Sequence, residues 1–216
     1  MPTAETSAQR PRKERKENAD IRRSQLLEAT RRSIVANGLS KTTLATVAAE
    51  AGLSQGVAVF YYKSKAGLLA ETLRDQYARY EANWTQALAN ADDDALSQVI
   101  AMIKSDFDPT ISDSNNLAVW YAFWGELKVT PQFGEISSQF DSNRRNIMRD
   151  IFNRLLADNA PLESDQISDW IENLTDGYWQ KLHLFPESTT RARGVEATLR
   201  MLAQLLPSYA DLIKAS

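Results

Sequence analysis

Hydrophobic residues recur at steps of three and four along most of the chain. This spacing puts apolar side chains on one face of an α-helix, which has 3.6 residues per turn. No segment shows sustained alternation of the kind that forms a strand. We therefore expect an all-α protein with about nine helices, over residues 20–37, 43–51, 54–62, 64–88, 92–107, 117–128, 131–155, 164–185 and 188–206.

Short polar residues, glycine and proline mark the ends of these helices. Asp20, Thr43, Ser54 and Ser164 are expected N-caps, because their side chains can accept from free backbone N–H groups. Ser188 is the expected start of the final helix. Gly38 and Gly52 are expected to end the first two helices, and Asp108-Pro109, Pro186 and Pro207 to stop later ones. The apolar face of the first helix is expected to hold Ile21, Leu26, Leu27, Ile34 and Val35.

Residues 43–65 form the most specific motif. They predict a short helix, a turn at Gly52, a second short helix and the start of a third. This arrangement is typical of a helix-turn-helix, whose second helix places its N-terminal end in the major groove of DNA.

The order of residues in this motif resembles the TetR family of bacterial repressors. The matching positions are Thr43, Val47-Ala48, Ala51 to Ser54, Gly56, Tyr61-Tyr62 and Lys65. The resemblance implies a three-helix DNA-binding head followed by a larger helical domain for ligand binding and dimerisation. We expect a flexible basic arm over 1–18, the head over 19–66 and the larger domain over 67–216.

Contacts to the DNA backbone are expected from two groups of residues. Thr43 and Ser54 lie at helix N-termini, where hydroxyls and free N–H groups suit phosphate oxygens. By the resemblance, residues at the positions of Thr43, Tyr61 and Lys65 touch the backbone. The alternatives are capping alone for Thr43 and Ser54, core packing for Tyr61 and a solvated charge for Lys65.

Base reading is expected from the exposed face of residues 55–60. Gln55 can pair with an adenine edge, whereas Val57 and Val59 offer only methyl contact, which favours thymine. Gly56 lets the helix lie close to DNA, and Phe60 either faces DNA or packs. Ala58 and Tyr62 should face the core of the head. Ala45, Val59 and Phe60 are apolar where the family often has other residues, so we predict few hydrogen bonds to bases and more reliance on methyl contacts and DNA shape.

Charge is distributed unevenly along the chain. Residues 1–70 hold 12 Lys and Arg against 6 Asp and Glu, a net of +6, whereas residues 71–216 hold 13 against 22, a net of −9. A basic front suits a protein that meets a polyanion with one end. The arm over 1–18 either stays solvated or reaches a neighbouring groove.

Composition excludes several classes of protein. The 216 residues include no cysteine, and no apolar run approaches the length of a membrane span or a signal peptide. We expect a cytoplasmic protein without a membrane partner. The one histidine, His183, lacks a nucleophile partner, and no phosphate loop or metal-ligand cluster appears, so we expect no enzyme, no metal and no cofactor.

The larger domain is rich in aromatic residues near carboxylates. Aromatic residues concentrate in Val119–Trp124 and in Asp176–Trp179. With Phe107-Asp108, these stretches resemble the C-terminal domain of the choline-responsive repressors of the BetI type within the same family. Aromatic faces beside a carboxylate can hold a quaternary ammonium group. The alternative is ordinary core packing. The residues expected to bind such a ligand are Phe107, Asp108, Trp120, Trp124, Asp176 and Trp179.

These observations lead to the hypothesis that the chain is a ligand-responsive transcriptional regulator that acts as a repressor. It would bind a palindromic double-stranded DNA operator as a homodimer through helices 164–185 and 188–206, and a small-molecule effector, choline or a related quaternary amine, would release it. The alternative is a DNA-binding regulator whose larger domain binds another protein or only dimerises.

Overall fold

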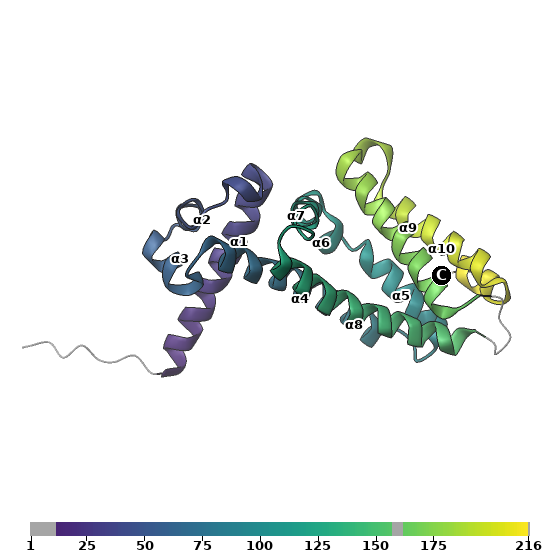
Figure 1. Ribbon diagram of the computed structural model, residues 1–216. Coiled ribbons are helices and arrows are strands. Elements are labelled where there is room, and N and C mark those ends of the chain that lie inside the picture. Colours follow the sequence, from purple (N-terminus) through teal and green to yellow (C-terminus); the bar gives the residue numbers. More distant parts are fainter. Residues whose placement is uncertain (1–11, 157–161, 216) are drawn as a thin grey trace, which may run out of the picture. The chain divides into compact units, whose positions relative to one another are not determined.

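The computed structural model describes residues 12–156 and 162–215, with side chains from residue 17 onward. The described residues form helices and no strand (Figure 1). They divide into two compact units, Met1–Thr72 and Leu73–Ser216, which we call the head and the body. The boundary falls inside helix α4, Lys65–Asn90.

The head contains α1 (Arg12–Lys41), α2 (Leu44–Glu50), α3 (Gln55–Tyr62) and the first turns of α4. Asp20 does not cap α1, which begins at Arg12, so residues 12–18 are helical rather than a flexible arm. Lysine, arginine and glutamate in that stretch all favour helix. The arm predicted over 1–11 lies outside the described residues. Gly38, the predicted end of the first helix, breaks the regular helix with a φ of 76°, but helical structure continues to Lys41.

The buried face of α1 differs from the predicted one at two positions. Leu26 and Ile34 are buried, but Ile21 and Val35 are exposed. At 100° per residue, Ile21 lies about 140° and Val35 about 180° around the helix from Leu26. The face that packs in the head carries small and polar residues as well, including Ala29, Thr30 and Ser33.

The body consists of the rest of α4 and seven further helices: α5 (Ala95–Asp106), α6 (Pro109–Ser112), α7 (Ser114–Trp124), α8 (Pro131–Leu155), α9 (Ser164–Leu184), α10 (Arg191–Leu205) and α11 (Ala210–Ala215). Short 3₁₀ turns cover Pro186–Ser188 and Pro207–Tyr209. Apolar side chains from α4, α5, α8, α9, α10 and α11 form one core. Figure 1 shows α9 and α10 running side by side.

Several helix ends differ from the predictions. Helix α7 begins at Ser114, because Asp113 accepts from two backbone N–H groups, and ends at Trp124 rather than near residue 128. Glu163, not Ser164, caps α9 in a reciprocal pair with Gln166. Thr190, not Ser188, caps α10. Helices α6 and α11 were not predicted.

No helix within the described ranges is long and apolar enough to cross a membrane.

Candidate DNA-binding surface and ligand pocket

Reciprocal hydrogen bonds fix the start of α2. The Thr43 hydroxyl accepts from the Thr46 backbone N–H at 3.1 Å, and the Thr46 hydroxyl accepts from the Thr43 N–H at 2.8 Å. Gly52 has a φ of +66°, a conformation that glycine adopts without strain. The chain therefore turns sharply between α2 and α3. Ser54 occupies the N-cap position of α3, but its side chain makes no capping bond.

The exposed face of α3 carries most of the residues predicted to read bases. Gln55, Gly56, Val59 and Phe60 are exposed, Val59 by 41% and Phe60 by 67%. Val57 is half-buried and packs against the core of the head, so less of it is available than predicted. Ala58 and Tyr62 are buried in that core, as predicted.

The residues predicted to touch the DNA backbone also have partners within the head. Tyr61 is half-buried, and the Arg23 guanidinium lies over its ring, 5.6 Å from the centroid. The Lys65 ammonium donates to the Ser40 carbonyl at 2.7 Å. This bond links the start of α4 to the C-terminal end of α1, and it leaves two N–H donors of the ammonium for another acceptor.

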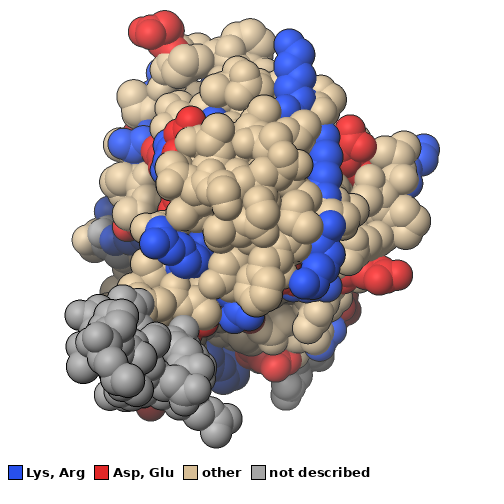
Figure 2. Space-filling model, turned by 90° about the vertical axis from the view of Figure 1, so that its left-hand side faces the viewer, with Lys and Arg blue, Asp and Glu red and all other residues tan. Residues whose placement is uncertain are grey.

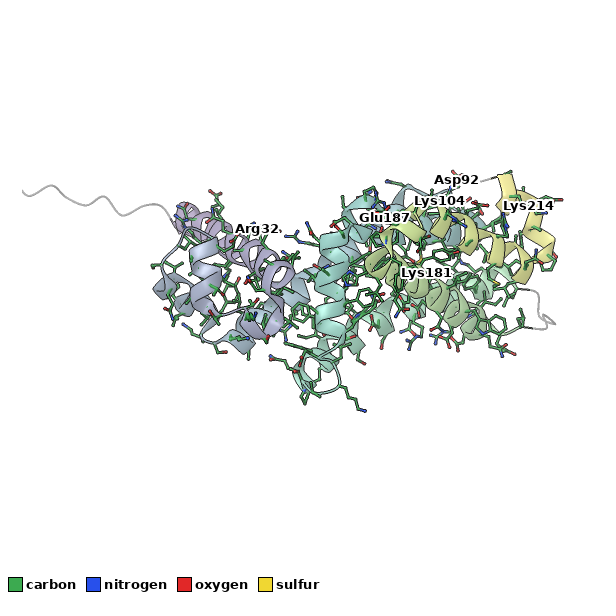
Figure 3. The ribbon with its side chains drawn as sticks, turned by 90° about the horizontal axis from the view of Figure 1, so that it is seen from above. Arg32, Asp92, Lys104, Lys181, Glu187 and Lys214 are labelled. Atoms are coloured by element: carbon green, nitrogen blue, oxygen red, sulfur yellow. The ribbon has the colours of Figure 1, made fainter. Side chains whose placement is uncertain are left out.

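Lys and Arg border a broad uncharged area in the view onto the left-hand side of Figure 1 (Figure 2). Arg32, labelled in Figure 3, pairs with Glu50 at 2.7 Å and so joins α1 to α2.

The body contains a pocket of about 270 Å³. Helices α4, α5, α7, α8 and α9 all contribute to its lining. The volume is near the lower limit of small-molecule sites, which suits a compact ligand. The lining residues are Tyr77, Tyr80, Asp106, Trp120, Trp124, Leu127, Ser137, Asp141, Arg144, Arg145, Glu172, Thr175, Asp176 and Trp179.

Three tryptophans form one wall of the pocket. The ring centroids of Trp120, Trp124 and Trp179 lie 6.0–6.3 Å from one another, and Trp124 and Trp179 are stacked at 15°. Rings this close leave no room for a cation between them. Trp120 and Trp179 are buried, whereas Trp124 is partly exposed. A ligand would therefore lie against the wall that the rings form.

A buried cluster of charged side chains forms a second part of the pocket lining. Arg144 donates to both carboxylate oxygens of Asp106, at 3.0 and 2.8 Å, and to Glu172 at 3.0 Å. The Tyr80 hydroxyl donates to Asp106 at 2.7 Å. The Trp179 indole donates to the Asp106 backbone carbonyl at 2.9 Å. The aromatic wall and the ion cluster are thus connected.

Asp176 differs from the other carboxylates of the pocket. It lines the pocket and is exposed, and the protein atoms around it partly desolvate it. Desolvation raises the pKa of Asp176 to about 7, and the negative charges of Glu172 and Asp106 add to this rise. The carboxyl therefore keeps its proton to a higher pH than an ordinary aspartate does.

The structure brings together four of the six residues predicted to bind a ligand: Trp120, Trp124, Asp176 and Trp179. Phe107 and Asp108 do not line the pocket. Phe107 is buried beside Tyr178, and Asp108 accepts from the Thr110 N–H at the start of α6. The predictions missed Tyr77, Tyr80, Asp106, Arg144 and Glu172. A charged Arg144 among the apolar positions of α8 was the available signal.

A small helix-turn-helix head joined to a larger helical body defines a transcriptional regulator of bacterial type, not an enzyme. Residues 26–72 match the family model for bacterial regulatory proteins of the tetR family. Residues 95–207 match the model for the C-terminal domain of BetI-type transcriptional repressors. The chain belongs to the TetR family, and its body is of the BetI type.

Individual relatives agree with this assignment. The chain is 32% identical over 164 residues to the HTH-type transcriptional regulator BetI of Burkholderia thailandensis, covering 74% of this chain and 80% of the relative. Its fold is similar to a protein from Pseudomonas aeruginosa PAO1 described as a transcriptional regulator, with a TM-score of 0.78, 23% identity and coverage of 90% and 94%. It is also similar to a regulator from Saccharomonospora viridis solved in complex with choline, with a TM-score of 0.72, 15% identity and coverage of 83% and 94%.

Proposed function

We propose that this regulator is a repressor that binds a palindromic operator as a homodimer, and that a small cationic effector, choline or a related quaternary amine, releases it. The observation that carries the effector part is the pocket. It combines a tryptophan wall with more carboxylates than arginines, which is the chemistry that attracts a quaternary ammonium ion.

The exposed face of α3 would read the operator. Gln55 and Gly56 lie at its N-terminal end, where a helix-turn-helix meets the major groove. Thr43, Ser54, Tyr61 and Lys65 would contact phosphates around it. Such contacts give affinity and orientation, while the side chains of α3 give specificity.

One face of α9 would form the dimer interface. Trp170, Leu174, Gly177, Lys181 and Leu184 follow one another at steps of four and three, the spacing of helices that pack nearly parallel. Trp170 and Leu184 are 44% and 53% exposed, although both are large and apolar. By the same spacing, Lys181, which is labelled in Figure 3, belongs to this face of α9. An identical α9 from a second copy would cover these residues.

The neighbouring face of α10 supports the same interface. Met201 is exposed there, in a groove of about 340 Å³ between α9 and α10. The groove is lined by Tyr178, Arg193, Glu196, Ala197, Arg200, Met201 and Gln204. Two helices from each copy would make a four-helix bundle.

Gly177 indicates where two copies of α9 would approach most closely. A side chain added at this position would meet no atom within 4 Å, so the packing of one copy does not explain a glycine there. Glycine inside a helix costs about 1 kcal/mol relative to alanine. Close approach of a partner helix would offset this cost.

Mobility-shift measurements on fragments of the protein's own promoter region test the proposal. We expect binding without effector and weaker binding with choline chloride, compared at equal ionic strength with sodium chloride because DNA binding depends on salt. Binding that does not respond to any quaternary amine would favour the alternative, a body that only dimerises or binds another protein. Failure to bind any such fragment at low salt would contradict the DNA-binding part.

A further inference from the structure

Four carboxylates line the pocket, and three of them have partners. Asp106 accepts from Arg144 and Tyr80, and Glu172 accepts from Arg144. Asp141 accepts from the Ser137 hydroxyl at 2.7 Å. The Asp176 carboxylate accepts no hydrogen bond and forms no ion pair among the residues that the structure describes. It is the one carboxylate of the pocket with its lone pairs available to a ligand.

We propose that Asp176 is the counter-ion of the effector and that a cation enters this pocket by displacing a proton from the Asp176 carboxyl. The inference rests on the proposed function, since it concerns the same pocket. The cation and the protonated carboxyl become a carboxylate–cation pair, and the proton goes to solvent. Charge is conserved, and the pocket gains no net charge.

The charges around the pocket explain why a proton would be held before the cation arrives. With Asp176 neutral, the three remaining carboxylates face two arginines, Arg144 and Arg145. Ionisation of Asp176 would add a second surplus negative charge beside Glu172 and Asp106, which is unfavourable until an opposite charge arrives.

Every helix that packs around the pocket contributes titratable or charged groups near the Asp176 carboxyl. Desolvation, with the charges of Glu172 and Asp106, already places the pKa of Asp176 near 7. Burial also raises the pKa of Glu172 and of Asp141. His183, two turns along α9, stacks on Tyr121 with ring centroids 4.9 Å apart. The facing groups are Tyr77 and Tyr80 (α4), Asp106 (α5), Tyr121 (α7), Asp141, Arg144 and Arg145 (α8), and Glu172 and His183 (α9).

The pH dependence follows from the direction of the shift. Above the pKa of the empty pocket, Asp176 is ionised and a cation binds without releasing a proton. Below that pKa, each cation must displace a proton, so the apparent affinity falls about tenfold per pH unit. Affinity should therefore be constant at alkaline pH and decline as pH falls through about 7.

The pocket should also discriminate among cations. Both terminal nitrogens of Arg144 are engaged by Asp106 and Glu172, and its Nε, which has no hydrogen-bond partner, is buried away from the solvent. A zwitterion would bring its own negative charge toward Asp176. A permanent cation without a carboxylate is the class of ligand that fits.

Isothermal titration of the full-length protein with choline tests the inference. Titrations at about pH 6 and about pH 8, each in two buffers of different ionisation enthalpy, count the protons released. We expect nearly one proton per choline and about tenfold weaker binding at the lower pH, and almost no proton release at the higher pH.

Three variants identify the side chain that releases the proton. Asp176→Asn should weaken binding at the higher pH and abolish the pH dependence. Asp169 is an exposed residue seven positions earlier on α9 and lies outside the pocket lining. Asp169→Asn should leave the choline affinity and its pH dependence unchanged. His183→Gln should also keep the pH dependence.

The outcomes separate this inference from the proposed function. Choline binding without proton release at either pH would overturn the inference alone. Loss of the pH dependence in His183→Gln but not in Asp176→Asn would also overturn it. No binding of choline or tetramethylammonium at any pH would overturn both.

Discussion

If α3 enters the major groove, as proposed, two apolar side chains on its exposed face limit the contacts that the head can make with bases. Val59 and Phe60 project from the exposed face of the helix and cannot hydrogen-bond to a base edge. What they can detect in the major groove is the C5 methyl group of thymine. Gln55 remains as the one side chain on this face that can pair with a base. Recognition should therefore depend strongly on thymine methyl groups.

Replacing thymidine with deoxyuridine throughout a promoter fragment removes those methyl groups and leaves the Watson–Crick edges unchanged. We expect affinity to fall by several-fold for each contacted thymine, because burying one methyl contributes about 0.8 kcal/mol. Fluorescence anisotropy titrations measure the ratio of the two affinities.

The double variant Val59→Ala, Phe60→Ala should bind both fragments with similar affinity, whereas Val129→Ala, an exposed position in the body, should behave like the wild type. An unchanged ratio in the double variant would mean that uracil acts through the shape of the DNA.

At Arg144, removal of one charge leaves another buried without compensation. Arg144→Met keeps the volume of the side chain but leaves Asp106, which is 1% exposed, with only the Tyr80 hydroxyl. We expect the free energy of unfolding at pH 7 to fall by about 3–5 kcal/mol. Denaturant titration at fixed protein concentration measures the change.

Lower pH should reduce this loss. In the variant, burial without a partner raises the pKa of Asp106 in the folded state above its value in the unfolded state. The loss in the free energy of unfolding is therefore complete above the folded-state pKa. It declines as the pH falls below that pKa, because protonation neutralises the carboxyl. Arg145→Met is the matched control, since Arg145 is half exposed and lies 4.0 Å from Glu172; about 0–1 kcal/mol is expected there. Equal losses in the two variants would contradict the role of the buried pair.

Two glycines inside helices serve different packing needs. In α10, a Cβ at Gly194 would collide with the buried ring of Phe107, with Cζ only 2.8 Å away. The absence of a side chain at Gly194 therefore lets α10 pack closely against Phe107, the residue that follows α5. A Cβ at Gly177 on α9 would meet nothing within 4 Å, so its small size matters only if a partner packs there, as in the proposed dimer.

Glycine-to-alanine substitutions should thus have opposite effects at these positions. Gly194→Ala should lower the free energy of unfolding by about 1–3 kcal/mol, because the ring must shift in a filled core. Gly177→Ala should favour the isolated helix by up to about 1 kcal/mol and weaken dimerisation. Denaturant unfolding and sedimentation equilibrium measure the two effects. A dimer unaffected by Gly177→Ala would exclude a helix crossing at this position.

Local sequence signals predict the helices and turns better than they predict which side chains meet in the folded protein. Thr43 and Gly52 place α2 and α3 correctly, because a cap and a left-handed turn depend on neighbours in sequence. Helices α6 and α11 are too short to show a period. Aromatic density pointed to Trp120, Trp124 and Trp179.

The partners of those tryptophans could not be predicted from the sequence. Tyr80 lies on α4 and Arg144 on α8, and a one-dimensional pattern does not say which helix faces meet. Phe107 was wrongly placed in the pocket for the same reason, since its ring turns toward Gly194 and Tyr178.

At the scale of the whole molecule, α4 is the helix through which a ligand could act on DNA binding. It contributes Leu68 to the core of the head and Tyr77 and Tyr80 to the pocket of the body. An effector that binds better to a non-operator conformation would shift the population away from the DNA-binding one. The size of the shift is set by the difference between its affinities for the two conformations.

Thermodynamic linkage makes this coupling measurable from both sides. If saturating choline weakens operator binding by some factor, operator DNA must weaken choline binding by the same factor, which for allosteric proteins is typically about 5- to 150-fold. Anisotropy titrations give the first factor, with sodium chloride replacing choline chloride in the control because salt alone weakens DNA binding. Calorimetric titration of choline into the protein–DNA complex gives the second. Equal factors, both lost in Asp176→Asn, would tie the pocket to the head through one equilibrium; unequal factors would mean that choline acts on a further step, such as dimerisation, and the simple two-state coupling would have to be abandoned.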